Sequence, residues 1–446
     1  MVVLWTDGLI YLLVVMVTGL GLYMRGQEHL RRPWRKVTGS VIGMLSLVVL
    51  LFFVIIGLLD SIHFKASGKS NEIISVLDYW ATPLREHQEK TYSAPFSAYL
   101  YNKELMISES GQQSWGYPRL VYGGRHLQDP ASEKLQDIAV KLSLGLLKGA
   151  GLFAVFFVLL WSLRREQQRT LITGRAARAV WLLLFLLSSG SYALIDLSGY
   201  YHVLGTDKVG EDVFYQTVKS IRTGLVIGTL TTMIMLPMAI LFGILAGFFR
   251  GWVDDVIQYV YTTLNSIPSV LLIAASILMV QVYMANNEQA YTSVVVRADM
   301  RLLFLCLILG VTSWTGLCRM LRAETLKLRE KEYVQAAQAL GVRQGMILFR
   351  HILPNVMHIV LISVVLDFSS LVLAEAVLSY INIGVDPTTY SWGNMINGAR
   401  LEMAREPVVW WSLGASFLFM FTLVLAANLF ADTVRNAFDP RRVENV

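Results

Sequence analysis

Nine long apolar stretches, separated by polar segments, dominate the pattern of hydrophobic and polar positions along the chain. Each approaches or exceeds the roughly 20 apolar residues that an α-helix needs to cross a bilayer. Backbone polar groups in lipid must be paired within their own segment, so each stretch is expected to be a transmembrane helix. The predicted spans are 6–24, 37–59, 143–163, 177–197, 219–249, 259–283, 299–318, 356–380 and 409–431.

Basic residues between these stretches gather on one side of the predicted membrane. The chain is 55% hydrophobic and only 16% charged, with a net charge of +6, and a soluble domain rarely has so little charge. Cytoplasmic loops of membrane proteins carry an excess of Lys and Arg. The asymmetry therefore predicts an outside N-terminus and an inside C-terminus, and it explains the basic charge without a nucleic-acid partner. The basic clusters lie within 25–36, 164–178 and 319–350.

The lengths of the polar segments divide the chain near residue 176. Residues 1–176 hold three predicted spans and an external insert, 60–143, whose aromatic residues predict a folded extracytoplasmic domain because disordered linkers lack them. Residues 177–446 hold six spans with short connections, apart from the inside loop 319–355 and an outside loop. We therefore predict an all-α polytopic membrane protein with a six-helix core, three extra N-terminal spans and an extracytoplasmic insert.

The inside loop has the pattern of a helix–turn–helix elbow. Residues 324–340 are good helix formers, and Gly341 follows where a left-handed C-cap would end that helix. A second short helix, 344–352, is expected to end before Pro354, which can start the next span. Such an elbow fits a docking surface for a cytoplasmic protein and an ordinary interfacial helix equally well. The small-residue face expected on the first helix consists of Ala336, Ala337 and Leu340.

This elbow resembles the EAA loop of permease subunits of binding-protein-dependent ABC importers. That loop reads Glu-Ala-Ala, three residues, Gly, nine residues, Ile, one residue and Leu-Pro. The chain has Gln335 in place of the Glu, and its Ile352 comes one position late, with His351 in the usual slot. The preceding Glu-Tyr-Val resembles the dipeptide, oligopeptide and nickel branch of the family. The docking residues that the resemblance implies are Glu332, Tyr333, Gln335, Ala336, Ala337, Gly341, Leu353 and Pro354.

Three further segments resemble the C-type permease of that branch. Residues 202–213 are similar to its HxLGTDxxGxDV motif, 378–395 to its LSFLGLG…SWGxM motif, and 428–441 to its terminal NLLGDxLRDxLDPR motif. With the elbow they cover about residues 200–442 in the family's order. The first 176 residues lie outside this core and resemble the extension of a long-form variant.

The resemblance implies a function and a set of partners. In this family the elbow docks on an ATPase, whose closure on ATP is passed to the spans and drives alternating access. We therefore expect half of a heterodimeric pore in the bacterial inner membrane, working with a second permease, two cytoplasmic ATPases and an extracytoplasmic binding protein. Peptides are the expected cargo. Nickel complexes, opines and peptide antibiotics are alternatives, because the binding protein largely sets specificity.

Signatures of an enzyme, a metal site and a nucleotide site are missing from the sequence. It contains no H-E-x-x-H, no G-x-S-x-G and no G-x-x-x-x-G-K-[ST], so ATP and Mg²⁺ are expected only on partner subunits. His351 and His358 share a region but lack a third metal ligand. A membrane scaffold or sensor that uses the 60–143 insert is an alternative of another class, and a membrane-embedded hydrolase has only isolated polar residues in its favour.

Some charged residues fall inside predicted spans, where ionisable groups are functional candidates. Asp367 and Glu375 lie within about 80° of each other on a helix of 3.6 residues per turn. They could line the transport pathway and meet a peptide amino group, or they could pair with a basic residue or cap a helix. Asp196 and Lys148, near the outer ends of their spans, are expected to snorkel towards water.

Small residues and a proline predict two details of helix packing. Gly243, Gly247 and Gly251 form a ladder that allows close approach of another helix, from this chain or from another subunit. Pro268 should kink the sixth span or mark its start.

Overall fold

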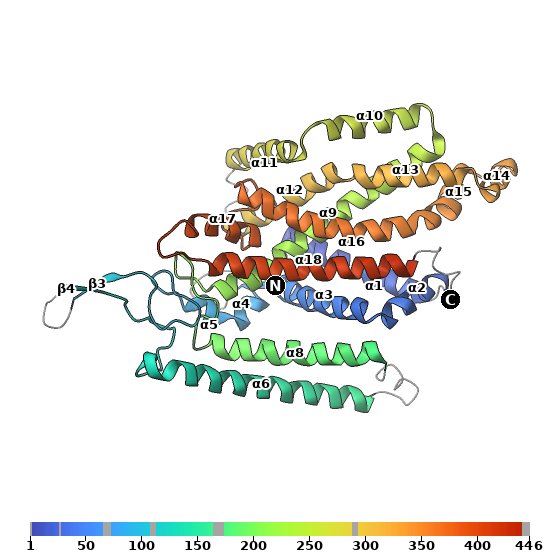
Figure 1. Ribbon diagram of the computed structural model, residues 1–446. Coiled ribbons are helices and arrows are strands. Elements are labelled where there is room, and N and C mark those ends of the chain that lie inside the picture. Colours follow the sequence, from blue (N-terminus) through green and yellow to red (C-terminus); the bar gives the residue numbers. More distant parts are fainter. Residues whose placement is uncertain are drawn as a thin grey trace. The chain divides into compact units, whose positions relative to one another are not determined.

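The computed structural model describes residues 2–25, 28–65, 73–107, 113–163, 174–287 and 293–438, which are mostly helical (Figure 1). Contacts divide the chain into two compact units. The first consists of 1–2, 38–223 and 390–423, and the second of 3–37, 224–389 and 424–446. Both units contain residues from each side of position 176, so the domain boundary proposed there stays a prediction.

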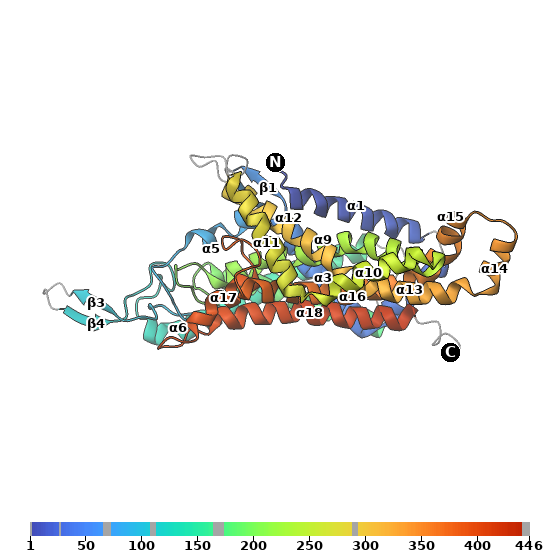
Figure 2. The same cartoon turned by 90° about the horizontal axis from the view of Figure 1, so that it is seen from above.

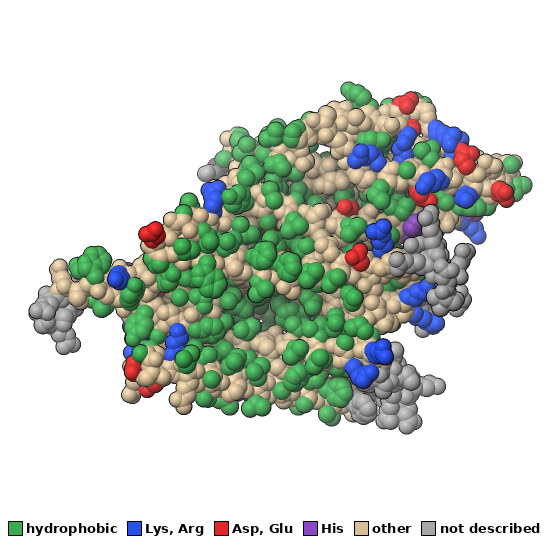
Figure 3. All heavy atoms as spheres, in the orientation of Figure 1, with side chains coloured by type: hydrophobic (Ala, Val, Ile, Leu, Met, Phe, Trp, Pro, Cys, Tyr) green, Lys and Arg blue, Asp and Glu red, His purple; other side chains and the backbone are tan. Residues whose placement is uncertain are grey.

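Long helices form the membrane part of the first unit. They are α3 (Val41–Asp60), α6 (Pro130–Leu163), α8 (Arg175–Ser198) and the first part of α18 (Trp411–Phe438), with the first turns of α9 (Val213–Phe249) and the short α17 (Trp392–Glu402). The antiparallel helices α6 and α8 pack closely because Gly145 and Gly149 lack side chains. A Cβ at either glycine would lie 2.7 Å from a Cα atom of α8. Hydrophobic side chains cover the length of this helical pair (Figure 3).

The insert folds as small elements between α3 and α6. They are β1 (His63–Lys65), β2 (Ile73–Ser75), α4 (Val76–Trp80), α5 (Thr82–Glu86), β3 (Glu104–Ile107) and β4 (Gln113–Gly116). Two antiparallel hairpins result, with Phe64 opposite Ile74 in one and Leu105 opposite Trp115 in the other. The described insert is therefore ordered, as its composition predicted. Its buried apolar residues include Ile74, Tyr92, Ala98, Leu100, Leu120 and Leu127.

The second unit contains the remaining helices. They are α1 (Trp5–Arg25), α2 (Glu28–Gly39), α10 (Trp252–Ser266), α11 (Ser269–Asn286), α12 (Val294–Ser313), α13 (Thr315–Arg329), α14 (Glu332–Ala339), α15 (Gln344–Ile347) and α16 (Leu353–Tyr380), with parts of α9 and α18. Helix α1 packs on α12, where Asp299 accepts hydrogen bonds from the backbone N–H groups of Trp5 and Thr6 at 3.0 and 3.3 Å. A carboxylate at a helix N-terminus satisfies unpaired donors there.

The prediction of a helical, multi-pass membrane protein is confirmed, whereas the count of nine spans is not. Within the described residues, seven helices are long and apolar enough to cross a bilayer. Trp5–Gly19 is a shorter apolar helix, and α12, which carries Arg297, Asp299 and Arg301, is not among the seven. The seven are Val41–Asp60, Pro130–Leu159, Arg175–Ser198, Val213–Phe249, Ser269–Asn286, Gln344–Tyr380 and Trp411–Phe438.

Three local predictions can be compared directly with the structure. Pro268 does mark a helix start, since it separates α10 from α11. Two rungs of the glycine ladder pack within the chain, because a Cβ at Gly243 or Gly247 would lie 2.8 or 2.6 Å from atoms of α13. Gly251 instead takes a left-handed backbone, with φ of 57°, directly before α10.

The structure gives Lys148 and Asp196 a contact that the sequence analysis did not anticipate, while snorkelling of these residues stays a prediction. The Nζ atom of Lys148 lies 3.2 Å from each carboxylate oxygen of Asp196. The two residues pair with each other because α6 and α8 run side by side, a neighbourhood that the spacing of the spans along the chain does not reveal.

Candidate functional site

The elbow is built from three short helical pieces at one end of α13 and α16 (Figures 1 and 2). Helix α13 ends at Arg329, Lys331 takes an extended backbone with φ of −75° and ψ of 141°, and α14 then begins at Glu332. The single helix predicted over 324–340 is therefore wrong. The extended Lys331 breaks it although every residue nearby favours a helix, because packing of α14 overrides local propensity.

Gly341 ends α14 as predicted. Its φ of 73° lies in the left-handed region that favours glycine. The N–H of Gly341 donates to the carbonyl of Gln338 at 3.0 Å, and the N–H of Val342 donates to the carbonyl of Ala337 at 3.1 Å. This pair of bonds is a Schellman motif, which satisfies carbonyls that the helix end leaves unpaired.

The second half of the elbow joins the following span without a break. Helix α15 begins at Gln344, close to the predicted start, but a π-helical turn, Leu348–Ile352, leads directly into α16. Pro354 lies in the first turn of α16 and cannot donate to the carbonyl four residues before it. The helix widens at this point, so that Leu353 donates to the carbonyl of Leu348. Proline here changes the helix type and does not end the helix.

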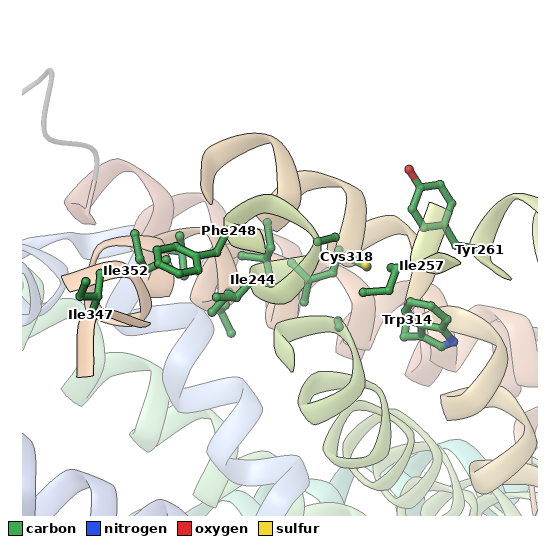
Figure 4. Packing of buried hydrophobic residues seen from close by; sticks show 14 of the residues in the cluster. Ile244, Phe248, Ile257, Tyr261, Trp314, Cys318, Ile347 and Ile352 are labelled. Carbon is green, nitrogen blue, oxygen red and sulfur yellow. The ribbon is translucent and has the colours of Figure 1, made fainter. Parts of the chain in front are cut away.

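One face of the elbow is buried in the second unit. Val334, Ala337, Ile347 and Ile352 are buried and join a hydrophobic cluster formed mainly by α9, α10, α13 and α16 (Figure 4). The elbow is therefore packed onto the ends of membrane helices. A force on the elbow would reach those helices through side chains in close contact.

Polar contacts hold the same region from its sides. Arg322 of α13 makes a two-bond ion pair with Asp254 of α10, at 2.5 and 2.7 Å. Arg329 donates to the carbonyl of Phe248 at 2.8 Å, and Arg250 pairs with Glu330 at 2.6 Å. The bidentate Arg–carboxylate geometry is the strongest of these contacts.

The opposite face of the elbow is exposed and apolar. Leu340 is 83% exposed and Phe349 is 74% exposed, and Met346 and Val342 are exposed beside them in the sequence. We call these four side chains the elbow face. Sequence reasoning missed Met346 and Phe349, although two large apolar residues in a polar loop, out of phase with the buried positions, were an available signal.

The structure separates the predicted docking residues into two groups. Ala337 points into the buried cluster, so it does not share an exposed small-residue face with Ala336 and Leu340. The Tyr333 hydroxyl accepts a hydrogen bond from Asn355 Nδ2 at 3.2 Å, which links α14 to the start of α16. Leu353 packs partly against the buried cluster. The exposed members of the predicted set are Glu332, Tyr333, Gln335, Ala336, Gly341 and Pro354.

The two acidic residues of α16 have different surroundings. Glu375 is buried, and its Oε1 accepts a hydrogen bond from the Ser379 hydroxyl at 2.7 Å. Asp367 is half-buried, and no hydrogen bond or ion pair from the described residues reaches its carboxylate. Within that described part of the chain, His, Cys, Asp and Glu side chains form no group of three or more that could hold a metal ion.

On the first unit, the segment 202–213 is held by a buried ionic contact to the insert. The Nδ1 atom of His202 lies 2.7 Å from Asp212, and its Nε2 lies 3.5 Å from Glu89. Burial opposes the charge on His202, but Asp212 and Glu89 outweigh it and raise the pKa of the imidazole to about 9. Glu89 also accepts hydrogen bonds from the backbone of residues 121–123. Burial works against its charge too, but these partners hold its pKa below the usual range.

Two glycines of that segment let the insert approach. A Cβ at Gly210 would lie 1.8 Å from the carbonyl oxygen of Glu89, and one at Gly205 would lie 2.4 Å from that of Ser93. Both glycines have positive φ. The 202–213 motif by itself does not reveal that the insert supplies the second carboxylate beside His202.

Comparison with known proteins identifies relatives of the chain. Residues 239–444 match the family of binding-protein-dependent transport system inner membrane components. A protein named as a peptide permease of Brucella suis is 34% identical over 243 residues, which are 54% of this chain and 73% of that protein. The oligopeptide transport system permease protein OppC of Mycobacterium tuberculosis is 31% identical over 288 residues, which are 61% of this chain and 92% of that protein.

A dipeptide transport system permease protein, DppC of Lactococcus lactis, is 30% identical over 55% of this chain and 65% of that protein. Among solved structures, an inward-facing MetNI methionine ABC transporter covers 50% of this chain and 98% of its own, with 15% identity and a TM-score of 0.36. The sequence matches cover most of the length of the Brucella suis peptide permease and of the Mycobacterium tuberculosis OppC protein. The chain is a multi-pass protein of the bacterial inner membrane, and it belongs to the family of binding-protein-dependent transport system inner membrane components.

Proposed function

We propose that the chain is a transmembrane subunit of an ATP-driven importer that moves peptides across the inner membrane. The names of its relatives, which are peptide, oligopeptide and dipeptide permeases, support this cargo. The observation that carries the mechanism is the elbow, which is buried on one face against membrane helices and exposes an apolar face on the other. An ATPase docked there can bias the spans if it binds one of their arrangements more tightly than the other.

The partners follow from this mechanism. Two cytoplasmic ATPase subunits would bind ATP and Mg²⁺, a second permease would complete the pore, and an extracytoplasmic binding protein would deliver the peptide. The residues proposed for ATPase docking are the exposed members of the predicted set together with the elbow face. Residues 1–176 would be an extension of the permease core, which would itself occupy 177–446.

Asp367 is the stronger candidate for the transport pathway. Its carboxylate is half-buried on a membrane helix and has no hydrogen-bond or ion-pair partner within the described residues, so a cationic group such as a peptide amino terminus would compensate for its desolvation. Glu375 already accepts a hydrogen bond from Ser379. For Glu375 we therefore propose a structural role in α16 in preference to contact with the substrate.

The test is peptide uptake into proteoliposomes that contain the chain with its partner subunits. Leu340→Asp places a charge at the most exposed residue of the elbow face, where the wild-type side chain makes little contact with its own chain. We expect uptake of labelled peptide to fall by roughly tenfold or more, as for an interface hot spot, while the melting temperature of the chain stays unchanged.

A matched control is Val121→Asp, the same type of change at an exposed position of the insert. It should leave uptake intact. Normal uptake by Leu340→Asp would contradict the docking role of the elbow face. Uptake of nickel complexes but not of peptides by the wild type would contradict the proposed cargo.

A further inference from the structure

The β3–β4 hairpin of the insert exposes a row of apolar side chains on one face. Side chains alternate between the two faces of a strand, and Leu105 lies directly opposite Trp115. Leu105 is 46% exposed, Trp115 is 71% exposed, and Tyr117, which follows β4 in the same phase, is 50% exposed. Lys103 Nζ lies 5.6 Å from the centre of the Tyr117 ring. We call Leu105, Trp115 and Tyr117 the hairpin face.

On the other face of the hairpin, the one large apolar side chain among the described residues is Met106, which is 39% exposed. The side chain of Met106 lies over Gly116, so closely that a Cβ there would lie 2.4 Å from the Met106 methyl group. Lys90 pairs with Glu104 at 2.7 Å where β3 begins. The larger exposed apolar side chains of the hairpin therefore lie on the side of Leu105, Trp115 and Tyr117.

The base of the hairpin is fixed to the permease part of the first unit. The N–H of Ser93 donates to the Thr206 hydroxyl at 2.7 Å, and the N–H of Thr206 donates to the carbonyl of Ser93 at 3.1 Å. The Tyr101 hydroxyl donates to the carbonyl of Val408 at 3.1 Å, and its ring packs edge-on against Trp411. These contacts hold the hairpin next to the extracytoplasmic segments 202–213 and 402–411. A protein bound to the hairpin face would therefore lie close to those segments.

The geometry argues against the bilayer as the occupant of this face. Figure 1 shows the hairpin projecting beyond the ends of α6 and α8, two long apolar helices of the same unit, and Figure 2 shows it projecting beyond α6. Aromatic side chains that anchor a protein in the membrane interface lie near the ends of the spans. A two-stranded hairpin is marginally stable alone, and exposed Trp and Tyr residues are the side chains most enriched in protein–protein hot spots.

We infer that the hairpin face is a docking site for the peptide-loaded extracytoplasmic binding protein of the same transport system. The inference rests on the proposed function, because a transport system of this family depends on a soluble protein that must dock on the side where the insert is predicted to lie. The extension would thereby add a contact to the permease core and position the binding protein over segments 202–213 and 402–411.

The experiment uses the complete complex in nanodiscs with the purified binding protein of the system, loaded with peptide. Trp115→Ala should raise the concentration of binding protein needed for half-maximal stimulation of ATP hydrolysis by roughly tenfold or more. ATP hydrolysis without binding protein should stay unchanged, because Trp115 is not among the residues proposed for ATPase docking. The matched control is Trp80→Ala, since Trp80 is equally exposed on α4 but lies outside the hairpin.

The outcomes separate the two proposals. If the wild type is stimulated and Trp115→Ala responds identically, the docking inference is overturned while the proposed function stands. If Trp115→Ala changes the number of copies of this chain in the complex, the hairpin face joins copies and the inference is also overturned. If the wild type neither responds to the binding protein nor imports peptide, both proposals fail.

Discussion

At the scale of single residues, His202 shows how the insert and the segment 202–213 share one buried site. Its imidazole lies between Asp212, ten residues further along, and Glu89 of the insert. A buried charge is stable only where it is paired, and here the two carboxylates pair with one imidazolium. Removing the imidazole would leave two buried carboxylates without their shared cation, whereas removing one carboxylate would leave a single ion pair.

This site predicts a pH dependence of stability. The pKa of His202 rises from 6.5 to about 9 on folding, so its stabilising contribution is complete below pH 6.5 and is lost as the pH rises through 9. The pKa of Glu89 falls below 4.5 on folding. Its stabilising contribution is therefore complete above pH 4.5 and is lost as the pH falls through the pKa of the folded state. Both contributions are therefore complete between pH 4.5 and 6.5, and His202 should account for on the order of 2–3 kcal/mol there.

The measurement compares thermal unfolding of the wild type and His202→Gln in detergent at pH 6 and pH 9. The wild type should unfold at a higher temperature at pH 6, and the difference between the two proteins should shrink at pH 9. An equal difference at both values would show that His202 acts through packing and not through its charge.

At the scale of elements, the elbow depends on one backbone conformation. Gly341 has a φ of 73° but no side chain or backbone close enough to obstruct a Cβ. Any effect of a substitution there comes from backbone strain and not from a clash. Gly345, in the same elbow, is equally open but has no positive φ.

This pair gives a matched prediction. Gly341→Ala should cost about 1 kcal/mol of local strain, loosen the turn between α14 and α15, and lower the number of peptides imported per ATP hydrolysed. Gly345→Ala should preserve that ratio, since alanine favours the helix. The readout is uptake and ATP hydrolysis measured on the same proteoliposomes, and equal ratios in the two variants would contradict a coupling role for the turn.

At the scale of the whole molecule, each compact unit contains residues of both the extension and the core. In the first, the backbone of Glu89 and Ser93 fills the space above Gly210 and Gly205. In the second, Asp299 of α12 accepts hydrogen bonds from the first residues of α1. The extension is thus part of the folded permease.

A chain truncated to residues 177–446 should therefore fold poorly. Without the insert and α1, His202 loses its contact to Glu89, and Asp299 loses the hydrogen bonds from the backbone of Trp5 and Thr6. Buried polar groups of residues 177–446 would therefore lose interactions that stabilise them in the full chain. We expect the truncated chain to aggregate during size-exclusion chromatography in a detergent that keeps the full chain monodisperse. A monodisperse truncated chain that still binds its ATPases would show that the extension is dispensable for folding.

The sequence by itself determined the membrane class, most of the spans, the left-handed cap at Gly341 and the family motifs. These features depend on local patterns, namely runs of apolar residues and single positions where only glycine or proline fits. Tertiary structure alone decided that Ala337 faces inward while Leu340 and Phe349 face outward, that Lys331 interrupts a good helix sequence, and that Lys148 pairs with Asp196. It also brought Glu89 to His202. Each of these depends on which segments distant in the sequence become neighbours, because burial and ion pairing are properties of the packed chain.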